Sequence, residues 1–254
     1  MKKITILIIL GLCLISCDWI EHEKLNSFVC SYHGVSKLEL NQVENRVIKV
    51  DYSVYFAIYY HYKKQYVYNF EKLAAKHGDI GFNKKISWVG PEPGVISYQN
   101  IDFTAIRVFT ENDYNSSHLA GSSVNDIVRF LGRSSYPFIK SKYKLNRKED
   151  VKSKASDVWN KYVDLSLDPS NYGFNSEETP FSAVEKMVNQ LTAEDLILIG
   201  GTSFVGPNTK YPNLGFLYLT ELPNTSGIYN FRVDFVADDG KTYTENISME
   251  IKTD

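Results

Sequence analysis

Apolar and polar residues alternate most regularly between residues 47 and 62. Every second position there is apolar or aromatic, and polar residues such as Lys49 and Asp51 stand between them. Because the side chains of a strand point alternately to its two faces, this pattern predicts a long strand with one buried face. The polar segment 63–65 then predicts a turn into a short hairpin partner at 66–68.

A second alternating pattern lies near the end of the chain. Apolar residues occupy every second position over 229–235, and they alternate with polar residues again over 243–251. Asp239-Gly240 lies between the two stretches. An Asp-Gly pair between alternating segments is one of the strongest sequence signals for a β-hairpin, so we expect two antiparallel strands here.

Shorter patterns predict further elements. Short apolar or alternating runs favour strands, whereas apolar residues spaced three and four apart favour helices. Gly78 and Gly132 follow two of the helical patterns, as expected at a helix end. The predicted strands are 101–110, 162–167, 196–199 and 216–219, and the predicted helices are 70–77, 123–132 and 179–191.

These elements together predict a mainly β fold. Six to nine strands joined by hairpins, with two or three short helices, favour an antiparallel β-sandwich, immunoglobulin-like or transthyretin-like, with a closed barrel as the alternative. The 18 tyrosines and 14 phenylalanines agree with this, because aromatic residues favour strands. We expect a single domain over 30–254. A subdivision, if there is one, would fall at 140–154, a segment with seven basic residues that we interpret as an exposed loop.

The first residues have the pattern of a signal peptide. Lys2 and Lys3 precede an apolar run of 12 residues at 4–15. A helix that spans a bilayer needs about 20 apolar residues, so this run is too short to be a membrane anchor of that kind. We therefore expect residues 1–16 to be a leader that is removed.

The end of the leader points to lipid attachment. Leu14-Ile15-Ser16-Cys17 resembles the lipobox of bacterial lipoproteins. That resemblance implies diacylglycerol on the thiol of Cys17, cleavage before it and acylation of the new amine. The predicted partner is then a lipid bilayer, with 17–29 as a lipidated tether. The alternative is an ordinary secretory signal.

Acidic residues behind Cys17 bear on which membrane is involved. Asp18, Glu21 and Glu23 follow the cysteine closely. This resembles the surface-export signal of Bacteroidetes lipoproteins and implies the outer membrane or cell surface. Asp18 alone resembles an inner-membrane retention signal of enteric bacteria, which would place the chain on the periplasmic face of the inner membrane.

Charge and cysteine content exclude other classes. The formal net charge is -2, and loss of Lys2 and Lys3 with the leader lowers it to about -4, so we expect no nucleic-acid partner. Of the three cysteines, Cys13 would leave with the leader and Cys17 would carry lipid. Cys30 then has no cysteine to pair with, and we expect it to be a small buried residue.

The sequence predicts no catalytic residue, no cofactor and no metal site. Gly201-Thr202-Ser203 begins like a nucleophile elbow, but Val205 stands where the second glycine is needed. The five histidines are scattered without ligand spacing, so we interpret each as a surface or edge residue. Asp239-Gly240 is explained by the hairpin turn. The chain has 30 carboxylates, so a catalytic acid/base pair that comes together only in the fold remains an alternative.

Tyrosines gather on and after the 47–62 strand. Exposed aromatic rows can stack on sugars or bind partners, whereas buried ones pack across strands. We favour packing. The cluster is Tyr52, Tyr55, Tyr59, Tyr60, Tyr62, Tyr66 and Tyr68.

The segment 101–127 carries a family resemblance. A strand leads into a loop with Asp113-Tyr114, then the turn His118-Leu119-Ala120-Gly121 and a short helical pattern. This is similar to a segment in a family of uncharacterised Bacteroidetes lipoproteins, and the closing hairpin is similar too. The resemblance implies a β-rich fold and such an origin, and it carries no activity.

We therefore expect a lipid-anchored, surface-exposed protein with a non-enzymatic binding role. The partner would be a glycan, a protein or another envelope component. One alternative is a hydrolase whose site assembles from distant carboxylates. The other is a structural or fimbrial subunit of the envelope.

Overall fold

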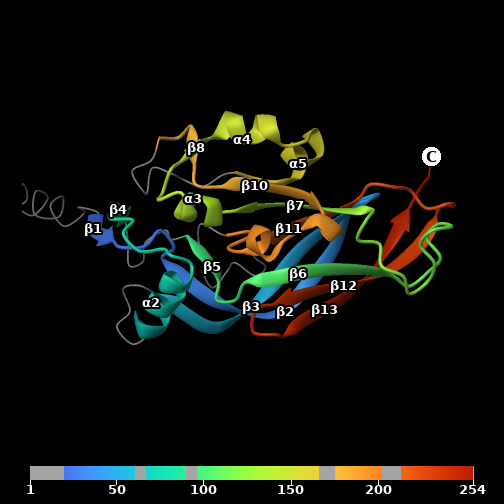
Figure 1. Ribbon diagram of the computed structural model, residues 1–254, viewed down its shortest axis with the longest axis horizontal. Coiled ribbons are helices and arrows are strands. Elements are labelled where there is room, and N and C mark those ends of the chain that lie inside the picture. Colours follow the sequence, from blue (N-terminus) through green and yellow to red (C-terminus); the bar gives the residue numbers. More distant parts are fainter. Residues whose placement is uncertain (1–19, 61–66, 90–95, 166–174, 202–212, 254) are drawn as a thin grey trace, which may run out of the picture.

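The structure is a computed structural model of the 254-residue chain, and it describes residues 20–60, 67–89, 96–165, 175–201 and 213–253 (Figure 1). Strands are the main secondary structure of this part. Four α-helices and two 3₁₀ helices accompany the strands: α2 (Val67–Lys76), α3 (Tyr136–Lys140), α4 (Lys148–Lys154), α5 (Asp157–Tyr162), η3 (Val188–Gln190) and η4 (Ala193–Leu196).

The largest sheet has six strands. Its order is β10-β7-β11-β3-β2-β5, and every neighbouring pair is antiparallel except β2 with β5. The strands are β10 (Ser182–Met187), β7 (Val128–Ser134), β11 (Asn213–Leu219), β3 (Val47–Tyr60), β2 (Ser31–Glu44) and β5 (Ser97–Gln99).

A three-stranded antiparallel sheet and two small pairs complete the strands. The three-stranded sheet has the order β13-β12-β6, and the small pairs are β1 with β4 and β8 with β9. Their bounds are β13 (Thr242–Ile251), β12 (Gly227–Ala237), β6 (Phe103–Thr110), β1 (Ile20–Leu25), β4 (Lys84–Val89), β8 (Asn146–Arg147) and β9 (Glu178–Thr179).

Both faces of the six-stranded sheet are buried. Phe130 of β7 belongs to a core shared with Phe231 and Phe235 of the three-stranded sheet. The next residue, Leu131, belongs to a second core with Trp159 of α5. Adjacent residues of a strand point to opposite faces, so the large sheet lies between the smaller sheet and a helical layer (Figure 1).

The mainly β, sandwich-like fold is therefore confirmed. The long strand appears as β3, and the closing hairpin as β12 and β13 with Gly240 at φ +85° in the turn. The strands expected at 101–110 and 216–219 correspond to β6 and β11. The immunoglobulin-like or transthyretin-like assignment stays a prediction. The predicted helix at 70–77 corresponds to α2, with Gly78 at φ +68° just beyond it.

Two predicted helices are strands instead. Residues 128–134 form β7, which pairs with β10 on one side and β11 on the other. Residues 182–187 form β10, and Val184 there points into the core between the sheets. In both segments the apolar spacing fits a helix as well as a strand, and pairing along the sheet decides in favour of the strand.

Other predicted elements were also wrong. Residues 67 and 68 are no hairpin partner, because α2 begins at Val67 and β3 pairs with β2 and β11. Tyr66 and the turn expected at 63–65 lie outside the described residues. Tyr162 ends α5 rather than starting a strand, and 196–199 holds the end of η4 and one isolated bridge. Short apolar runs do not distinguish strands from buried turns.

Two segments that were expected to be irregular contain helices or strands. The basic stretch 140–154 contains the end of α3, β8 and α4, with Val151 buried. The expected tether contains β1, and Phe28 and Val29 just after it are buried. Within the described residues no helix is long and apolar enough to cross a bilayer.

Candidate functional site

A cavity of about 600 Å³ lies between α4 and β10. In Figure 1, α4 and α5 lie beyond β10, on the side away from β7. Charged, polar and apolar side chains all contribute to the wall, among them Arg129, Val151, Lys154, Ser156, Glu185 and Met187. A cavity of this size with a few convergent polar groups is the usual form of a ligand site.

The sequence of the two helices explains where each helix begins and ends. Glu149 and Asp150 lie in the first turn of α4, and Lys152 and Lys154 lie in its last turn, an arrangement that suits the helix dipole. Ser156 then caps α5, because its hydroxyl accepts a hydrogen bond from the backbone N–H of Trp159 at 3.2 Å.

Glu185 joins α5 to the sheet. Its Oε1 accepts from Arg129 Nη1 at 3.0 Å and from the Ser156 hydroxyl at 2.5 Å. Its Oε2 accepts from the backbone N–H of Ser156 at 2.8 Å. Burial by itself would raise the pKa of Glu185, but these bonds outweigh it and hold that pKa below its ordinary value. The carboxylate is therefore ionised at neutral pH.

This arrangement suits binding better than proton transfer. A general acid needs a raised pKa, and the pKa of Glu185 is lowered. Lys186 is paired with Asp195 at 2.7 Å. Within the described part of the chain, Asp150 and Lys154 have no ion-pair partner, so the cavity offers one anion and one cation to a ligand.

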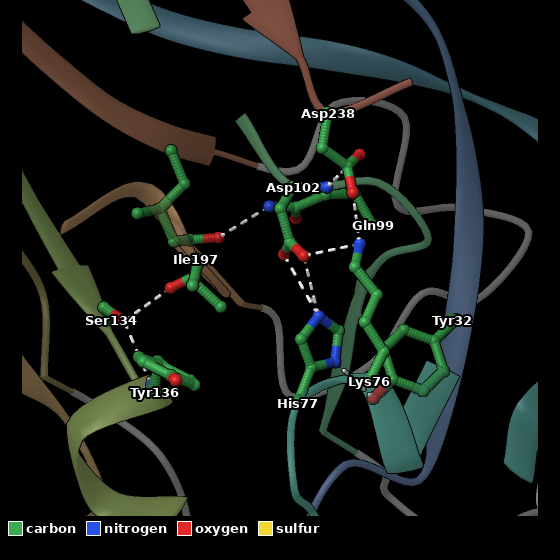
Figure 2. A network of polar contacts seen from close by, with 10 residues as sticks. Tyr32, Lys76, His77, Gln99, Asp102, Ser134, Tyr136, Ile197 and Asp238 are labelled. Carbon is green, nitrogen blue, oxygen red and sulfur yellow. Dashed lines mark hydrogen bonds and ion pairs between the residues drawn. The ribbon is translucent and has the colours of Figure 1, made fainter. Parts of the chain in front are cut away.

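A second polar cluster joins distant segments (Figure 2). Asp102 accepts from His77 Nε2 at 2.9 Å and from Lys76 Nζ at 2.6 Å. Lys76 also pairs with Asp238 at 2.5 Å. Because an ionised carboxylate only accepts, His77 Nε2 carries a proton, and the hydroxyl of Tyr32 lies 3.1 Å from Nδ1.

The order Tyr32, His77, Asp102 has the form of a catalytic relay, but it is closed to a substrate. Tyr32 is 0% exposed and His77 is 4% exposed. Burial, with the charge of nearby Asp79 adding to it, raises the pKa of Tyr32, which keeps its hydroxyl protonated. The cluster therefore holds α2, β2 and the β12–β13 turn together.

Two further buried groups are structural. His33 lies between the hydroxyls of Ser97 (2.8 Å) and Tyr52 (2.5 Å), and burial lowers its pKa to about 3, so it is neutral. Asp79 accepts from the backbone N–H groups of Phe28 and Val29, both at 2.8 Å. Burial raises the pKa of Asp79, but its side chain has no access to solvent.

The histidines are placed differently from the prediction. His33, His77 and His118 are buried rather than at the surface, because each ring finds hydrogen-bond partners. His118 lies against Asn115 and Asp126, both within 3.0 Å. The side chains of His22 and His61 lie outside the described residues. No group of three or more metal-ligating side chains occurs in the described ranges.

The other predicted residues have mixed outcomes. Cys17 lies outside the described residues, so lipid attachment stays a prediction. Cys30 is buried as expected, with its thiol donating to the carbonyl of Phe28. In the tyrosine cluster, Tyr52 is buried, as the packing interpretation expects. The ring of Tyr55 covers Gly34 across the strand pair, but this side chain is 46% exposed. Tyr68 is 79% exposed, and the side chains of the other four lie outside the described residues.

The residues of the cavity were missed by sequence analysis. Arg129, Ser156 and Glu185 come from three separate segments and meet only in the fold. The one available signal was Ser156-Asp157 ahead of Trp159, which is typical of a helix start. Neither a protein-family model, nor a curated protein, nor a solved structure matches this chain.

Proposed function

We propose that this chain is a lipid-anchored, surface-exposed envelope protein with a non-enzymatic binding role. Its ligand would occupy the cavity between α4 and β10. The observation that carries the proposal is the cavity itself, an open space of about 600 Å³ whose wall includes Glu185, held by hydrogen bonds from Arg129 and Ser156. Such preorganised walls reduce the entropy lost on binding.

The anchor rests on the leader and on Cys17. A basic start, a short apolar run and Leu14-Ile15-Ser16-Cys17 support lipid attachment. Ile20, three positions after Cys17, already pairs with Val89 in the β1–β4 ladder. A domain that begins so close to its lipid would work at the membrane surface. The acidic residues after Cys17 support the outer membrane or cell surface, and a Bacteroidetes origin goes with them.

The hydrolase alternative finds less support. Asp150 and Glu185 are the two carboxylates of the cavity wall. A pair of catalytic carboxyls usually includes one whose pKa is raised, so that it can donate a proton. The lowered pKa of Glu185 and its three donors make it a fixed anion instead.

The proposal is tested with the full chain in detergent, by screening a glycan array and a phage-displayed library of random linear peptides. We expect a ligand whose binding is weakened at least about tenfold by Lys154→Glu, because that change reverses an unpaired charge of the cavity wall. The matched control is Lys152→Glu, a lysine on the same helix that is also exposed but is not part of the wall. Ligands that respond equally to both changes, or no ligand at all, would overturn the proposal.

A further inference from the structure

The outer edge of β10 borders the cavity, and its backbone groups can be assigned from neighbouring contacts. Ala183 is the register partner of Arg133 in β7. The carbonyl of Arg133 accepts from the N–H of Gly200 at 2.9 Å, on the side of β7 that is away from β10. Ala183 and Arg133 therefore form a non-hydrogen-bonded pair, and the N–H and C=O of Ala183 point away from the sheet.

A second contact gives the same result. The carbonyl of Phe181, two residues earlier, accepts from the side chain of Asn146 at 3.1 Å, outside the sheet. The directions of the backbone N–H and C=O groups repeat every second residue in a strand, so those of Ala183 and Glu185 also point outward. Within the described residues, no hydrogen bond reaches the outward backbone groups of Ala183 and Glu185.

Two other sheet edges are protected in part. At β13, the side-chain amide of Gln42 binds the N–H and C=O of Glu250, and Asn45 binds those of Lys252. At β6, Asn125 Oδ1 accepts from the N–H of Val108 at 2.7 Å. Proteins commonly protect sheet edges in this way. Among the described residues no such bond protects Ala183 and Glu185, so their outward backbone groups are available to a partner.

We propose that the cavity receives an extended polypeptide segment, which adds to the edge of β10 as a further strand. This inference rests on the proposed function and names the class of ligand. The outward groups of Ala183 and Glu185 would make up to about four backbone hydrogen bonds with such a segment. Backbone recognition supplies affinity, and the cavity wall supplies preference for side chains.

The wall also indicates the side chains. Val151, Ala155 and Met187 give it apolar surface. Its remaining unpaired charges are Asp150 and Lys154, one of each sign. We therefore expect aliphatic side chains at alternate positions of the bound segment and an acidic side chain opposite Lys154. No aromatic residue is part of the described wall, which disfavours stacking on a sugar ring.

A second copy of the chain fits this edge less well than a single segment. In Figure 1, α4 and α5 extend past β10. A second copy that paired its own β10 here would bring its own α4 into the same space. One extended segment occupies only about 5 Å beyond the edge, the spacing of neighbouring strands.

The test is an N-methyl scan of a linear peptide selected from the random library on the full chain in detergent. Each backbone N–H of the peptide is methylated in turn. Strand addition predicts that affinity falls about tenfold at every second residue and little at the residues between, because only alternate N–H groups face β10. Losses at every residue, or at none, would overturn the inference.

Two measurements on the protein support the scan. The peptide should slow amide exchange in 182–187 and leave 242–251 unchanged. Ala183→Pro removes an outward N–H without removing a bond to β7, so it should weaken the peptide about tenfold at an unchanged melting temperature. If this variant does not fold, the N-methyl scan on the wild-type chain still tests strand addition.

The outcomes separate the two proposals. If the ligand weakened by Lys154→Glu is a glycan, the binding function stands and strand addition is overturned. The same holds if the ligand is a peptide whose N-methyl scan lacks the alternating pattern. Dimers that protect 182–187 without any peptide would also overturn it in favour of a second copy. Absence of any ligand that depends on the cavity overturns the function and the inference together.

Discussion

Asp102 Oδ2 lies 2.9 Å from His77 Nε2 and 2.6 Å from Lys76 Nζ, so one carboxylate binds two consecutive residues at the end of α2. Asp102 precedes β6 of the smaller sheet, and its backbone N–H donates to Asp238 in the β12–β13 turn. Tyr32 extends the cluster into the larger sheet. Figure 2 shows how these side chains converge from separate segments. The cluster is a polar joint between the two sheets and α2.

Asp102→Asn should therefore lower the free energy of unfolding by about 2–3 kcal/mol, because it removes the anion that pairs with His77 and one of the two anions that pair with Lys76. Lys76 is partly exposed, and its access to water limits the loss. Urea denaturation measures this change. Asp239→Asn, at an exposed position in the neighbouring turn, should have a much smaller effect. Equal losses in both variants would contradict the role given to Asp102.

His33 should make stability depend on pH. Its pKa is about 3 in the folded chain, against about 6.5 when unfolded. Between these values the unfolded chain binds one more proton, so the free energy of unfolding falls as pH falls. The expected slope from His33 is about 1.4 kcal/mol per pH unit below pH 6. Urea denaturation at several pH values measures this slope, and His33→Gln should remove it. The same slope in wild type and variant would refute the assignment.

Protonation of Asp102 should cause a second loss of stability, at a lower pH than the loss that begins with His33. Burial raises its pKa, but the bonds from His77 and Lys76 outweigh burial and leave it below the ordinary value. Its contribution is therefore present above the ordinary value near 4, and it is lost as pH falls below that value. Acid titration of Asp102→Asn should lack this step, whereas Asp239→Asn should retain it.

Ser156 both caps α5 and binds Glu185. Ser156→Ala should cost about 1–2 kcal/mol, since it removes a cap and a bond to an ionised carboxylate. Thermal unfolding compares it with Ser153→Ala, where the exposed hydroxyl contacts only the carbonyl of Asp150. The Ser153 change should be close to neutral. A loss as large as that of Ser156→Ala would show that hydroxyl removal in this region is costly in general.

The sequence predicted the parts of the fold that depend on local alternation. β3 and the β12–β13 hairpin follow from period-2 patterns and a turn with Asp239-Gly240. It failed for β7 and β10, where Leu131 and Val184 satisfy helical spacing and strand pairing alike. It could not predict the joint at Asp102, because Asp238 lies 136 residues away in the chain. Nor could it predict that Glu185 would meet Ser156, since that contact depends on the packing of α5 on the sheet.

Lipid attachment predicts a change of location for one cysteine variant. Cys17→Ser should move the protein from the membrane fraction to the soluble fraction of the host, because no acyl chain can be attached there. Cys30→Ala provides the control, since that buried residue has no part in anchoring. Fractionation and immunoblotting measure both. Retention of Cys17→Ser in the membrane at the wild-type level would contradict a lipid anchor.

The central claim is that this β domain binds its ligand at a membrane surface, held there by lipid on Cys17. The most direct test is mass spectrometry of the amino-terminal peptide of the protein extracted from its native membrane. We predict a mature chain that begins at Cys17 and carries diacylglycerol on the thiol. An unmodified Cys17, or a chain that still carries residues 1–16, would contradict the account.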